Sequence, residues 1–443
     1  MELPKGWVIA SWSDIVAIKH GQNQKNVEDP NGMYPIYGSG GQIGRATQYL
    51  CKAGSTVVGR KGTINRPFFT QTDFWNIDTA FGITPHDGIH PKYLYMFCNH
   101  FNFNTLDHST GRPSLTQTNL YRIKMPLPPF AEQQRIVAKI DTLFSKLDKG
   151  VKMLKTIRYQ LQTYRQAVLK WAFEGKLSCE WRKKYLTAAT IEAELREVRL
   201  SVISDVVDGA ETYINLDKDW IWVSLGDLFD VEVGATPSRK QPSYWEGDIW
   251  WVSSGEVKFN RIIATNEKIT KLGLENSSTN AHPIGTVLLA MIGEGKTRGR
   301  AAILKIPAAH NQNTAAILVR QQHSSEFLYY YLQYNYQNTR RVGSGNNQKA
   351  LNKERVKRLP FPYTSRREQD YIVNAIESRL SICEKLEAII DENFVKADAL
   401  RQSVLKKAFA GQLVPQDPTD EPANKLLERI KAQCQSAKAR PKP

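Results

Sequence analysis

The sequence has few of the features that mark disulfide-bonded, metal-binding or membrane proteins. Its five cysteines lie far apart and include no Cys-x-x-Cys pair, which argues against a disulfide framework and a structural zinc site. No apolar run approaches the roughly 20 residues that a membrane-spanning helix needs. The cysteine pattern favours a reducing environment, so we expect a cytoplasmic protein.

Catalytic motifs are also scarce. There is no Asn/Asp-Pro-Pro-aromatic tetrapeptide, so an adenine methyltransferase active site is not encoded. His86 and His90 are four residues apart, but Gly88 and Pro91 would break a helix between them. We interpret the histidines as surface or core residues and expect no metal ligands.

One segment imitates a phosphate-binding loop. Residues 290–297 end in Gly-Lys-Thr, but Ala290 stands where the strict pattern requires glycine. A phosphate-binding turn also has to open a helix, whereas a strand-like apolar run follows Arg300. We therefore expect no nucleotide binding here.

Positive charge, by contrast, is abundant. The chain has 60 Lys and Arg against 44 Asp and Glu, a formal net charge of +16, and the excess is spread over both globular stretches. This distribution favours two moderately basic surfaces and a polyanionic partner over a single basic tail. Since 41% of the residues are hydrophobic, the chain has enough apolar side chains to form cores.

The chain is one unit written twice. From Glu132 to Leu177 every residue aligns without a gap with the residue 236 positions later, so that Glu132 matches Glu368. The preceding globular stretches align loosely and need insertions. A part of constant length and a part that diverges suggest a fixed scaffold and a variable reader.

The constant part is predicted to be helical. Apolar residues recur in alternating steps of four and three, a heptad seam typical of a coiled coil. The first copy has Ile136, Ile140, Leu143, Leu147, Gly150, Leu154, Ile157, Leu161, Tyr164, Val168 and Trp171 on this seam. The second copy keeps Ile372, Ile376, Leu386, Ile390, Leu400 and Val404, and is weakened by Arg379, Cys383, Asn393, Ala397 and Lys407. Each helix would span roughly 70 Å; the alternative is two separate amphipathic helices, each packed on its own domain.

The globular parts contain short apolar runs between turns, and we predict mixed α/β domains. Residues 57–58, 287–292 and 315–319 are predicted buried strands, and residues 93–101 and 325–334 are predicted helices. Trp245, Trp250 and Trp251 could stack on bases, but filling of the core is the favoured interpretation.

Several motifs together resemble the specificity subunits of type I restriction–modification enzymes. They are the half-length repeat, a Pro-x-Pro followed by Glu-Gln-x-x-Ile-Val, and a helix end with Ala-Phe-x-Gly-x-Leu. Residues 34–41 and 234–250 are similar to the beginnings of target-recognition domains in that family. The resemblance implies that each domain reads half of a split DNA site and that the paired helices fix the gap. It also implies that this chain carries no catalysis, and that two modification (methyltransferase) subunits and restriction/translocase subunits bring S-adenosylmethionine, ATP and Mg²⁺.

The resemblance and the repeat together give an expected architecture. We expect an α/β mixed fold with two similar target-recognition domains, joined by two long antiparallel coiled-coil helices with pseudo-twofold symmetry. The expected parts are domain 1 (1–130), the first long helix (131–177), a linker with a short helix (178–213), domain 2 (214–363), the second long helix (364–413) and a C-terminal linker with a short helix (414–443).

Four loops, at matching places in the two repeats, are the candidate DNA contacts. They combine glycines, which let the backbone approach phosphates, with the basic, amide and hydroxyl side chains that bind phosphates and base edges. The candidate residues are Arg60, Lys61, Thr63, Asn65 and Arg66, then Ser109, Thr110 and Arg112, then Lys296, Arg298 and Arg300, and finally Arg341, Ser344, Asn346, Gln348 and Lys349. The alternative for any one residue is an ordinary solvated loop side chain.

Two other functions remain open at this point. One is a fused single-chain methyltransferase or nuclease, which would need a methyltransferase or nuclease motif and would transfer methyl groups without partner subunits. The other is a coiled-coil adaptor that binds only protein, which would show no dependence on DNA sequence. We expect the DNA site of the reader to be asymmetric, because the two domains differ in sequence.

Overall fold

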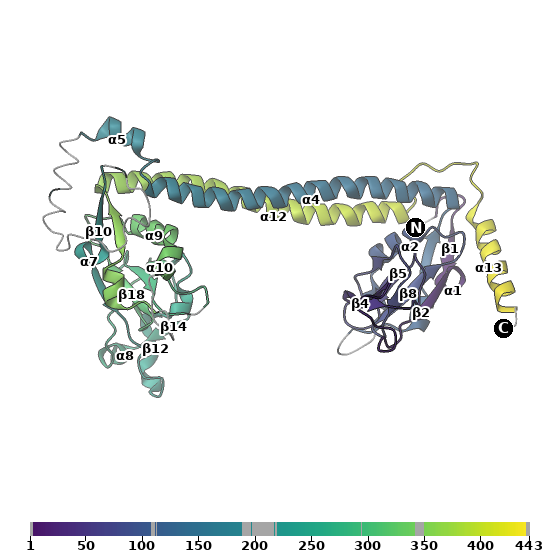
Figure 1. Cartoon of the computed structure of the whole chain (residues 1–443), viewed down its shortest axis with the longest axis horizontal. Coiled ribbons are helices and arrows are strands. Elements are labelled where there is room, and N and C mark those ends of the chain that lie inside the picture. Colours follow the sequence, from purple (N-terminus) through teal and green to yellow (C-terminus); the bar gives the residue numbers. More distant parts are fainter. Residues whose placement is uncertain are drawn as a thin grey trace. The chain divides into compact units, whose positions relative to one another are not determined.

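The chain folds into two compact units. The computed structural model describes residues 3–107, 111, 113–187, 196, 217, 219–293, 295–341 and 350–439. Unit 1 consists of Met1–Thr156 and Ile390–Pro443, and unit 2 consists of Ile157–Ile389. Each unit contains one β-rich domain and a stretch of each of two long helices (Figure 1).

Unit 1 is built on three sheets, with strand orders β2-β8-β5-β6, β4-β3-β7 and β1-β9. Its strands are β1 (Val8–Ser11), β2 (Val16–His20), β3 (Tyr34–Gly38), β4 (Gly41–Ala46), β5 (Thr56–Gly59), β6 (Phe68–Phe69), β7 (Trp75–Asn76), β8 (Ala80–Pro85) and β9 (Lys124–Leu127). Its shorter helices are α1 (Trp12–Ile15), α2 (Pro91–His100), η1 (Phe103–Leu106), α3 (Gln117–Tyr121) and α13 (Ala423–Ala439). Figure 1 shows α13 beside α1 and β1, where its apolar face adds Leu426 and Ile430 to the core of the unit.

Unit 2 repeats this plan with a larger central sheet. Its strand orders are β11-β18-β15-β16-β13, β14-β12-β17 and β10-β19. The strands are β10 (Ile221–Ser224), β11 (Asp230–Val233), β12 (Trp245–Val252), β13 (Asn260–Ile262), β14 (Glu267–Ile269), β15 (Val287–Ala290), β16 (Ala301–Leu304), β17 (Ala308–His310), β18 (Thr314–Leu318) and β19 (Pro360–Tyr363). The shorter helices are α5 (Cys179–Tyr185), α7 (Leu225–Leu228), η3 (Pro242–Tyr244), η4 (Ser254–Glu256), α8 (Lys271–Glu275), α9 (Ser325–Tyr334), α10 (Tyr336–Arg341) and α11 (Lys353–Lys357).

The predicted buried strands and helices are confirmed. Strands β5, β15 and β18 form where short, largely β-branched or aliphatic apolar runs lie between turns, and most of their side chains are buried. Helices α2 and α9 form at the two predicted places. The short helix expected in the C-terminal linker is α13, which includes residues 426–430. Of the helix expected in the first linker, at 191–202, all residues but Arg196 lie outside the described residues.

The two long helices are α4 (Phe130–Phe173) and α12 (Arg366–Phe409), each of 44 residues. In unit 1 the first part of α4 packs against the last part of α12, where Asp148 forms an ion pair with Arg401. In unit 2 the last part of α4 packs against the first part of α12, where Arg165 donates to Glu387 at 3.0 Å. These pairings require an antiparallel arrangement. The predicted mixed α/β class, with two β-rich domains and two long helices packed together, is confirmed.

The buried face of these helices differs in one of its two columns from the predicted seam. The column of Ile140, Leu147, Leu154, Leu161 and Val168 is buried or half-buried, as predicted. The other predicted column, which includes Leu143, Gly150, Ile157, Tyr164 and Trp171, is wrong for most of its length. The buried or half-buried column is one residue further along the chain and consists of Phe144, Val151, Arg158, Arg165 and Ala172. The residues it replaces include three that are exposed, namely Ile157 at 36%, Tyr164 at 40% and Trp171 at 43%.

The second long helix shows the same shift. Leu386 and Leu400, predicted on the seam, are 41% and 50% exposed, whereas Cys383, predicted to weaken it, is buried. The reason lies in the partner helix. Arg165 and Arg401 can occupy the helix contact because each finds a carboxylate opposite, and the periodicity of one helix does not contain that information.

Each domain is fastened to its own long helix by the glutamine of the repeated Glu-Gln motif. In unit 1 the backbone N–H of His90 donates to Oε1 of Gln133 at 2.8 Å. In unit 2 the backbone N–H of Ser324 donates to Oε1 of Gln369 at 2.9 Å. Both glutamines are fully buried. The bond fixes the start of α2 and of α9 in the same register on α4 and α12.

Candidate nucleic-acid interface

The first candidate loop of unit 1 lies beside residues 113–115, the described end of the second. Residues 59–66 follow β5, and the backbone N–H of Gly62 donates to the carbonyl of Pro113 at 2.9 Å. The N–H of Leu115 donates to the carbonyl of Arg60 at 2.8 Å, and Lys61 and Ser114 form a β-bridge. The sequence predicted two separate loops, and the structure joins the first loop and the described residues 113–115 into one surface.

The tip of the β3–β4 hairpin completes this surface. A Cβ on Gly59 would lie 2.0 Å from the carbonyl oxygen of Thr63 and 3.1 Å from Cβ of Ser39, so only glycine fits at this turn. The hairpin continues with Gln42, which is exposed, and Ile43, which is 54% exposed and unpaired in a β-bulge. Bulges of this kind redirect side chains next to functional sites.

The candidate side chains of unit 1 divide into exposed and engaged groups. Lys61, Thr63 and Arg66 are exposed. Arg60 is half-buried and donates from Nη1 to the carbonyl of Asp78 at 3.0 Å, which holds its guanidinium against the domain. Asn65 accepts the N–H of Phe103 at 2.9 Å, so part of its hydrogen-bonding capacity serves the fold.

The corresponding loop of unit 2 joins β15 to β16. Gly293 and Gly299 have φ of +145° and +83°, backbone conformations that favour glycine. Nη2 of Arg298 donates to the carbonyl of Arg340 at 3.2 Å and ties the loop to the end of α10. The strand β16 follows the loop, as the strand-like apolar run after Arg300 predicted.

A basic groove of about 410 Å³ lies between this loop and α10. It is lined by Lys258, Phe259, Lys296, Arg300, Tyr336, Gln337 and Arg340. Nη1 of Arg340 donates to the hydroxyl of Tyr336 at 2.8 Å, and that hydroxyl donates to the carbonyl of Lys296 at 2.6 Å. We call this group of seven residues the unit 2 groove. Its four cations suit phosphates, and its amide and aromatic side chains suit base edges and base faces.

Sequence reasoning missed part of the unit 2 groove. Strand β12 of unit 2 is equivalent to β3 of unit 1, because each pairs with one antiparallel and one parallel strand. Lys258 and Phe259 follow β12 and therefore take the place of the tip of the β3–β4 hairpin. No motif marks them, and only this strand pairing could have found them. Arg341, the predicted residue of α10, is exposed and outside the groove lining. The predicted Ser109, Thr110, Arg112, Ser344, Asn346, Gln348 and Lys349 lie outside the described residues.

Other candidate chemistry has structural explanations. In the described ranges, no three His, Cys, Asp or Glu side chains are placed to hold a metal ion. His310 and His282 are buried with their Nε2 atoms 3.1 Å apart, and burial followed by the charge of His282 lowers the pKa of His310 to about 3. Trp251 is buried and packs edge-on against Trp245, which confirms core filling for Trp251. No helix within the described part of the chain is long and apolar enough to cross a membrane.

Comparison with known proteins identifies the family. A family model described as the type I restriction modification DNA specificity domain matches residues 4–156 and 217–392. The chain belongs to this family. In a type I restriction–modification complex, such a specificity subunit determines which DNA target is recognised and is the non-catalytic component.

Curated and solved relatives agree. The specificity subunit is 20% identical to that of the EcoDI enzyme of Escherichia coli over 98% of this chain and 96% of the relative. It is 27% identical to that of the EcoBI enzyme of Escherichia coli over 77% and 70%. A chain solved in a study of assembly and conformational transition of the type I R-M system superposes with a TM-score of 0.70 at 16% identity, over 93% of this chain and all of that one. An HsdS subunit from Thermoanaerobacter tengcongensis gives 0.54 at 18% identity, over 93% and 98%.

Proposed function

We propose that this specificity subunit reads a bipartite, asymmetric site in double-stranded DNA, one half with each unit. The observation that carries the proposal is a cationic surface at matching places in both units, made of different side chains. Unit 1 offers Lys61, Thr63 and Arg66, with Gln42 on the neighbouring hairpin. Unit 2 offers the unit 2 groove. Because base recognition depends on the side chains presented, the two half-sites should differ in sequence.

The long helices supply the second part of the proposal. α4 and α12 are of equal length and have kept a gap-free alignment, whereas the domains have diverged. We infer that they hold the two half-sites at a fixed spacing.

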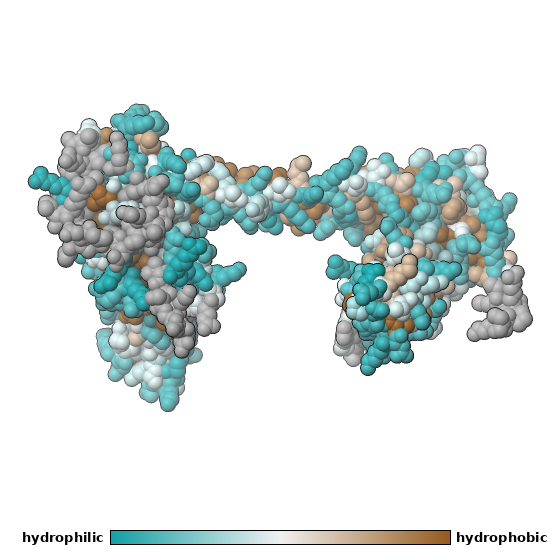
Figure 2. Space-filling view, viewed as in Figure 1, coloured by the Kyte–Doolittle hydropathy of each residue, from teal (hydrophilic) through white to brown (hydrophobic). Residues whose placement is uncertain are grey.

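The partners we propose are two methyltransferase subunits and the restriction/translocase subunits, which would carry S-adenosylmethionine, ATP and Mg²⁺. Figure 2 shows brown and pale residues along the long helices. On the unit 2 stretches Tyr164 and Trp171 are 40% and 43% exposed, and on the unit 1 stretches Val395 and Leu400 are 70% and 50% exposed. Exposed apolar side chains in such numbers favour a protein partner. The five free cysteines suit a cytoplasmic location.

Methylome sequencing of the host tests the proposal directly. We expect a split motif, methylated on both strands, with two unlike halves separated by a spacer of constant length. A continuous motif, or methylation without sequence preference in a host with active partner subunits, would contradict it.

Single substitutions then separate phosphate contacts from base contacts. We expect Lys258→Gln to weaken binding of the assembled complex to all sequences and to reduce the slope of log affinity against log salt by about 1. Gln42→Ala should instead relax the base preference in one half-site only. Met33→Ala, at an exposed residue before β3, is the matched control and should change neither.

A further inference from the structure

In each unit one helix of the domain contacts a long helix, α2 with α4 and α9 with α12, and the charged residues at the two contacts differ. His90 and Ser324 make the same bond to Gln133 and Gln369, so residues 92 and 326, two positions further, occupy equivalent places. On the long helices, Asp141 and Glu377 are 236 positions apart and also equivalent. One unit therefore places lysine opposite aspartate, and the other places two glutamates at the same joint.

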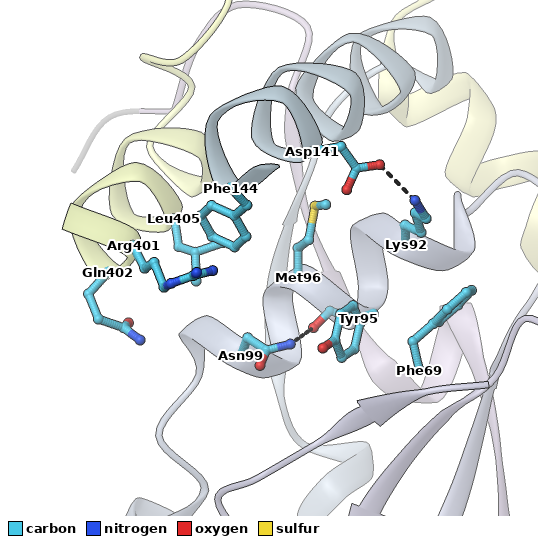
Figure 3. Close-up of a pocket in the computed structure, with 10 residues that line it drawn as sticks. All are labelled: Phe69, Lys92, Tyr95, Met96, Asn99, Asp141, Phe144, Arg401, Gln402 and Leu405. Atoms are coloured by element: carbon cyan, nitrogen blue, oxygen red, sulfur yellow. Dashed lines mark hydrogen bonds and ion pairs between the residues drawn. The ribbon is translucent and has the colours of Figure 1, made fainter. Parts of the chain in front are cut away.

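Unit 1 closes this joint with a direct ion pair. Nζ of Lys92 lies 2.7 Å from Oδ2 of Asp141, and both side chains are more than a third exposed. Beside the pair lies a cavity of about 290 Å³, whose walls include Tyr95, Met96 and Phe144 (Figure 3). An exposed single pair of this kind contributes little to stability, and the cavity leaves its neighbours room to move.

Unit 2 needs a cation between its two carboxylates, and Arg261 supplies it. Nη2 of Arg261 lies 2.6 Å from Oε2 of Glu326 on α9 and 3.1 Å from Oε1 of Glu377 on α12. The same nitrogen donates to the hydroxyl of Tyr330 at 3.2 Å, and the guanidinium lies 5.3 Å from the ring centre of Tyr329. Lys305 also pairs with Glu326, at 2.9 Å, but of these two cations Arg261 is the one that bridges both carboxylates, and without it Glu377 would face Glu326 with no shared cation between them.

Arg261 also belongs to the segment that lines the unit 2 groove. It is the middle residue of β13, which pairs with β16, and it follows Lys258 and Phe259 by two or three positions. Phe259 has φ of +57°, a conformation that a bulky residue adopts only when its surroundings hold it there. Its ring packs edge-on against Tyr336 of the groove. One side chain therefore links the groove, the domain helix α9 and the long helix α12.

We propose that Arg261 is a positioning residue that holds the unit 2 groove at a fixed angle on α12 and thereby sets which spacer length is accepted. The inference rests on the proposed function. One base pair advances the duplex by about 3.4 Å, so a small tilt of the domain on its helix moves the groove to the neighbouring base pair. The side chain touches no base itself. Its removal should broaden the spacer while leaving the sequence of both half-sites unchanged.

The test is the methylome of hosts that carry Arg261→Gln in the full complex, compared with the unsubstituted protein. We expect methylation of sites whose spacer is one base pair longer or shorter to rise about tenfold, with both half-site sequences retained. A uniform fall in methylation at an unchanged spacer would overturn the inference, as would relaxed base preference. If the unsubstituted protein shows no split motif, the proposed function fails first and takes the inference with it.

A rescue variant separates positioning from general destabilisation. Arg261→Gln combined with Glu377→Lys places a lysine opposite Glu326, which mirrors the direct pair of unit 1 and keeps the 2.9 Å pair between Lys305 and Glu326. We expect this double variant to restore the original spacer, and its failure to do so while methylating normally would overturn the inference. Arg239→Gln, which removes the exposed pair with Glu267 in the same unit, is the control and should leave the spacer unchanged.

Discussion

Both units bury a glutamate beneath a tryptophan, yet the two carboxylates have unequal partners. Nε1 of Trp7 donates to Oε2 of Glu132 at 3.0 Å, and Nε1 of Trp220 donates to Oε1 of Glu368 at 3.1 Å. Both glutamates are 1% exposed. The tryptophan bond is what the duplication has preserved, and the rest of each carboxylate's surroundings has diverged.

In unit 2 the carboxylate is fully satisfied. Glu368 also accepts from Ser178 at 2.5 Å, from Nε of Arg182 at 2.9 Å and from Thr364 at 2.5 Å. Arg182 in turn pairs with Asp217 at 2.6 Å. Burial lowers the pKa of Arg182, but the neighbouring carboxylates of Asp217 and Glu368 outweigh it and hold that pKa above its ordinary value, so the guanidinium stays charged.

In unit 1 the equivalent carboxylate, that of Glu132, has fewer hydrogen-bond donors around it. The residues that stand 236 positions from Ser178, Arg182 and Thr364 are valine, proline and proline, none of which has a side-chain donor. Oε1 of Glu132 is buried and makes no hydrogen bond within the described part of the chain. Burial raises the pKa of Glu132, against the Trp7 bond and Arg135, which lower it. The same buried glutamate is therefore surrounded by donors in one repeat and short of donors in the other.

The largest expected effect comes from removing the carboxylate of Glu368, which accepts hydrogen bonds from four side chains in unit 2. Glu368→Ala should cost about 3 to 5 kcal/mol of unfolding free energy, because it leaves the buried Arg182 short of a partner. Urea unfolding, followed by hydrogen exchange of unit 2 peptides, measures it. Glu132→Ala is the matched variant and should cost clearly less. Equal losses in the two variants would show that the partners of Glu368 contribute nothing.

The second largest expected effect is a greater loss of stability in unit 2 than in unit 1 on acidification. Burial, with nearby charges, lowers the pKa of His310 to about 3 and of His323 to about 4, both in unit 2. Such histidines bind protons more tightly when unfolded, so their contribution is complete above about pH 6.5 and is lost as the pH falls toward these values. From pH 6.5 to pH 5.5 each should cost unit 2 roughly 1 kcal/mol.

Hydrogen exchange at the two pH values, resolved by unit, checks this expectation. In unit 1 the pKa values of His90 and His100 are lowered by burial, but the raised pKa of Glu132 acts in the opposite direction. His323→Gln should remove its share of the pH dependence in unit 2. If unit 1 opened before unit 2 on acidification, the assignment would be wrong.

The smallest expected effect has the opposite sign. Glu132→Gln should stabilise unit 1 at pH 7 by up to about 1 kcal/mol, because a neutral amide removes the cost of a buried carboxylate that lacks donors. The gain should shrink at low pH, where the glutamate is itself protonated. Thermal unfolding at pH 7 and pH 5 measures both, and Glu368→Gln, which should destabilise unit 2, is the counterpart. A loss on Glu132→Gln at pH 7 would show that the charge is required.

The interface could be predicted in part. Glycines and clustered charge found the loops around Arg60 and Arg298, because a turn that must bend sharply and carry cations has a local signature. Their roles could not be predicted, since both arginines donate to backbone carbonyls contributed by distant residues. Lys258 was missed because its place in the unit 2 groove comes from strand pairing alone.

The long helices show where local information ends. Periodicity found both helices and one column of their contact, because apolar side chains at steps of seven must be covered. The second column was misplaced by one residue. Tyrosine and tryptophan are ordinary residues for a helix contact, whereas arginine is not, unless a carboxylate on the other helix pairs with it, as happens for Arg165 and Arg401.

By itself, the sequence determined the duplication, the mixed α/β class, the paired long helices and the family. These follow from periodicity, repeat length and motif order, which are properties of neighbouring residues and of their spacing. Only the tertiary structure decided which charges meet: Arg165 with Glu387, Arg182 with Glu368, and Arg261 between Glu326 and Glu377. The energy of a buried charge depends on partners from distant parts of the chain. The two repeats can therefore share a backbone arrangement and still differ in the ion pairs that stabilise it.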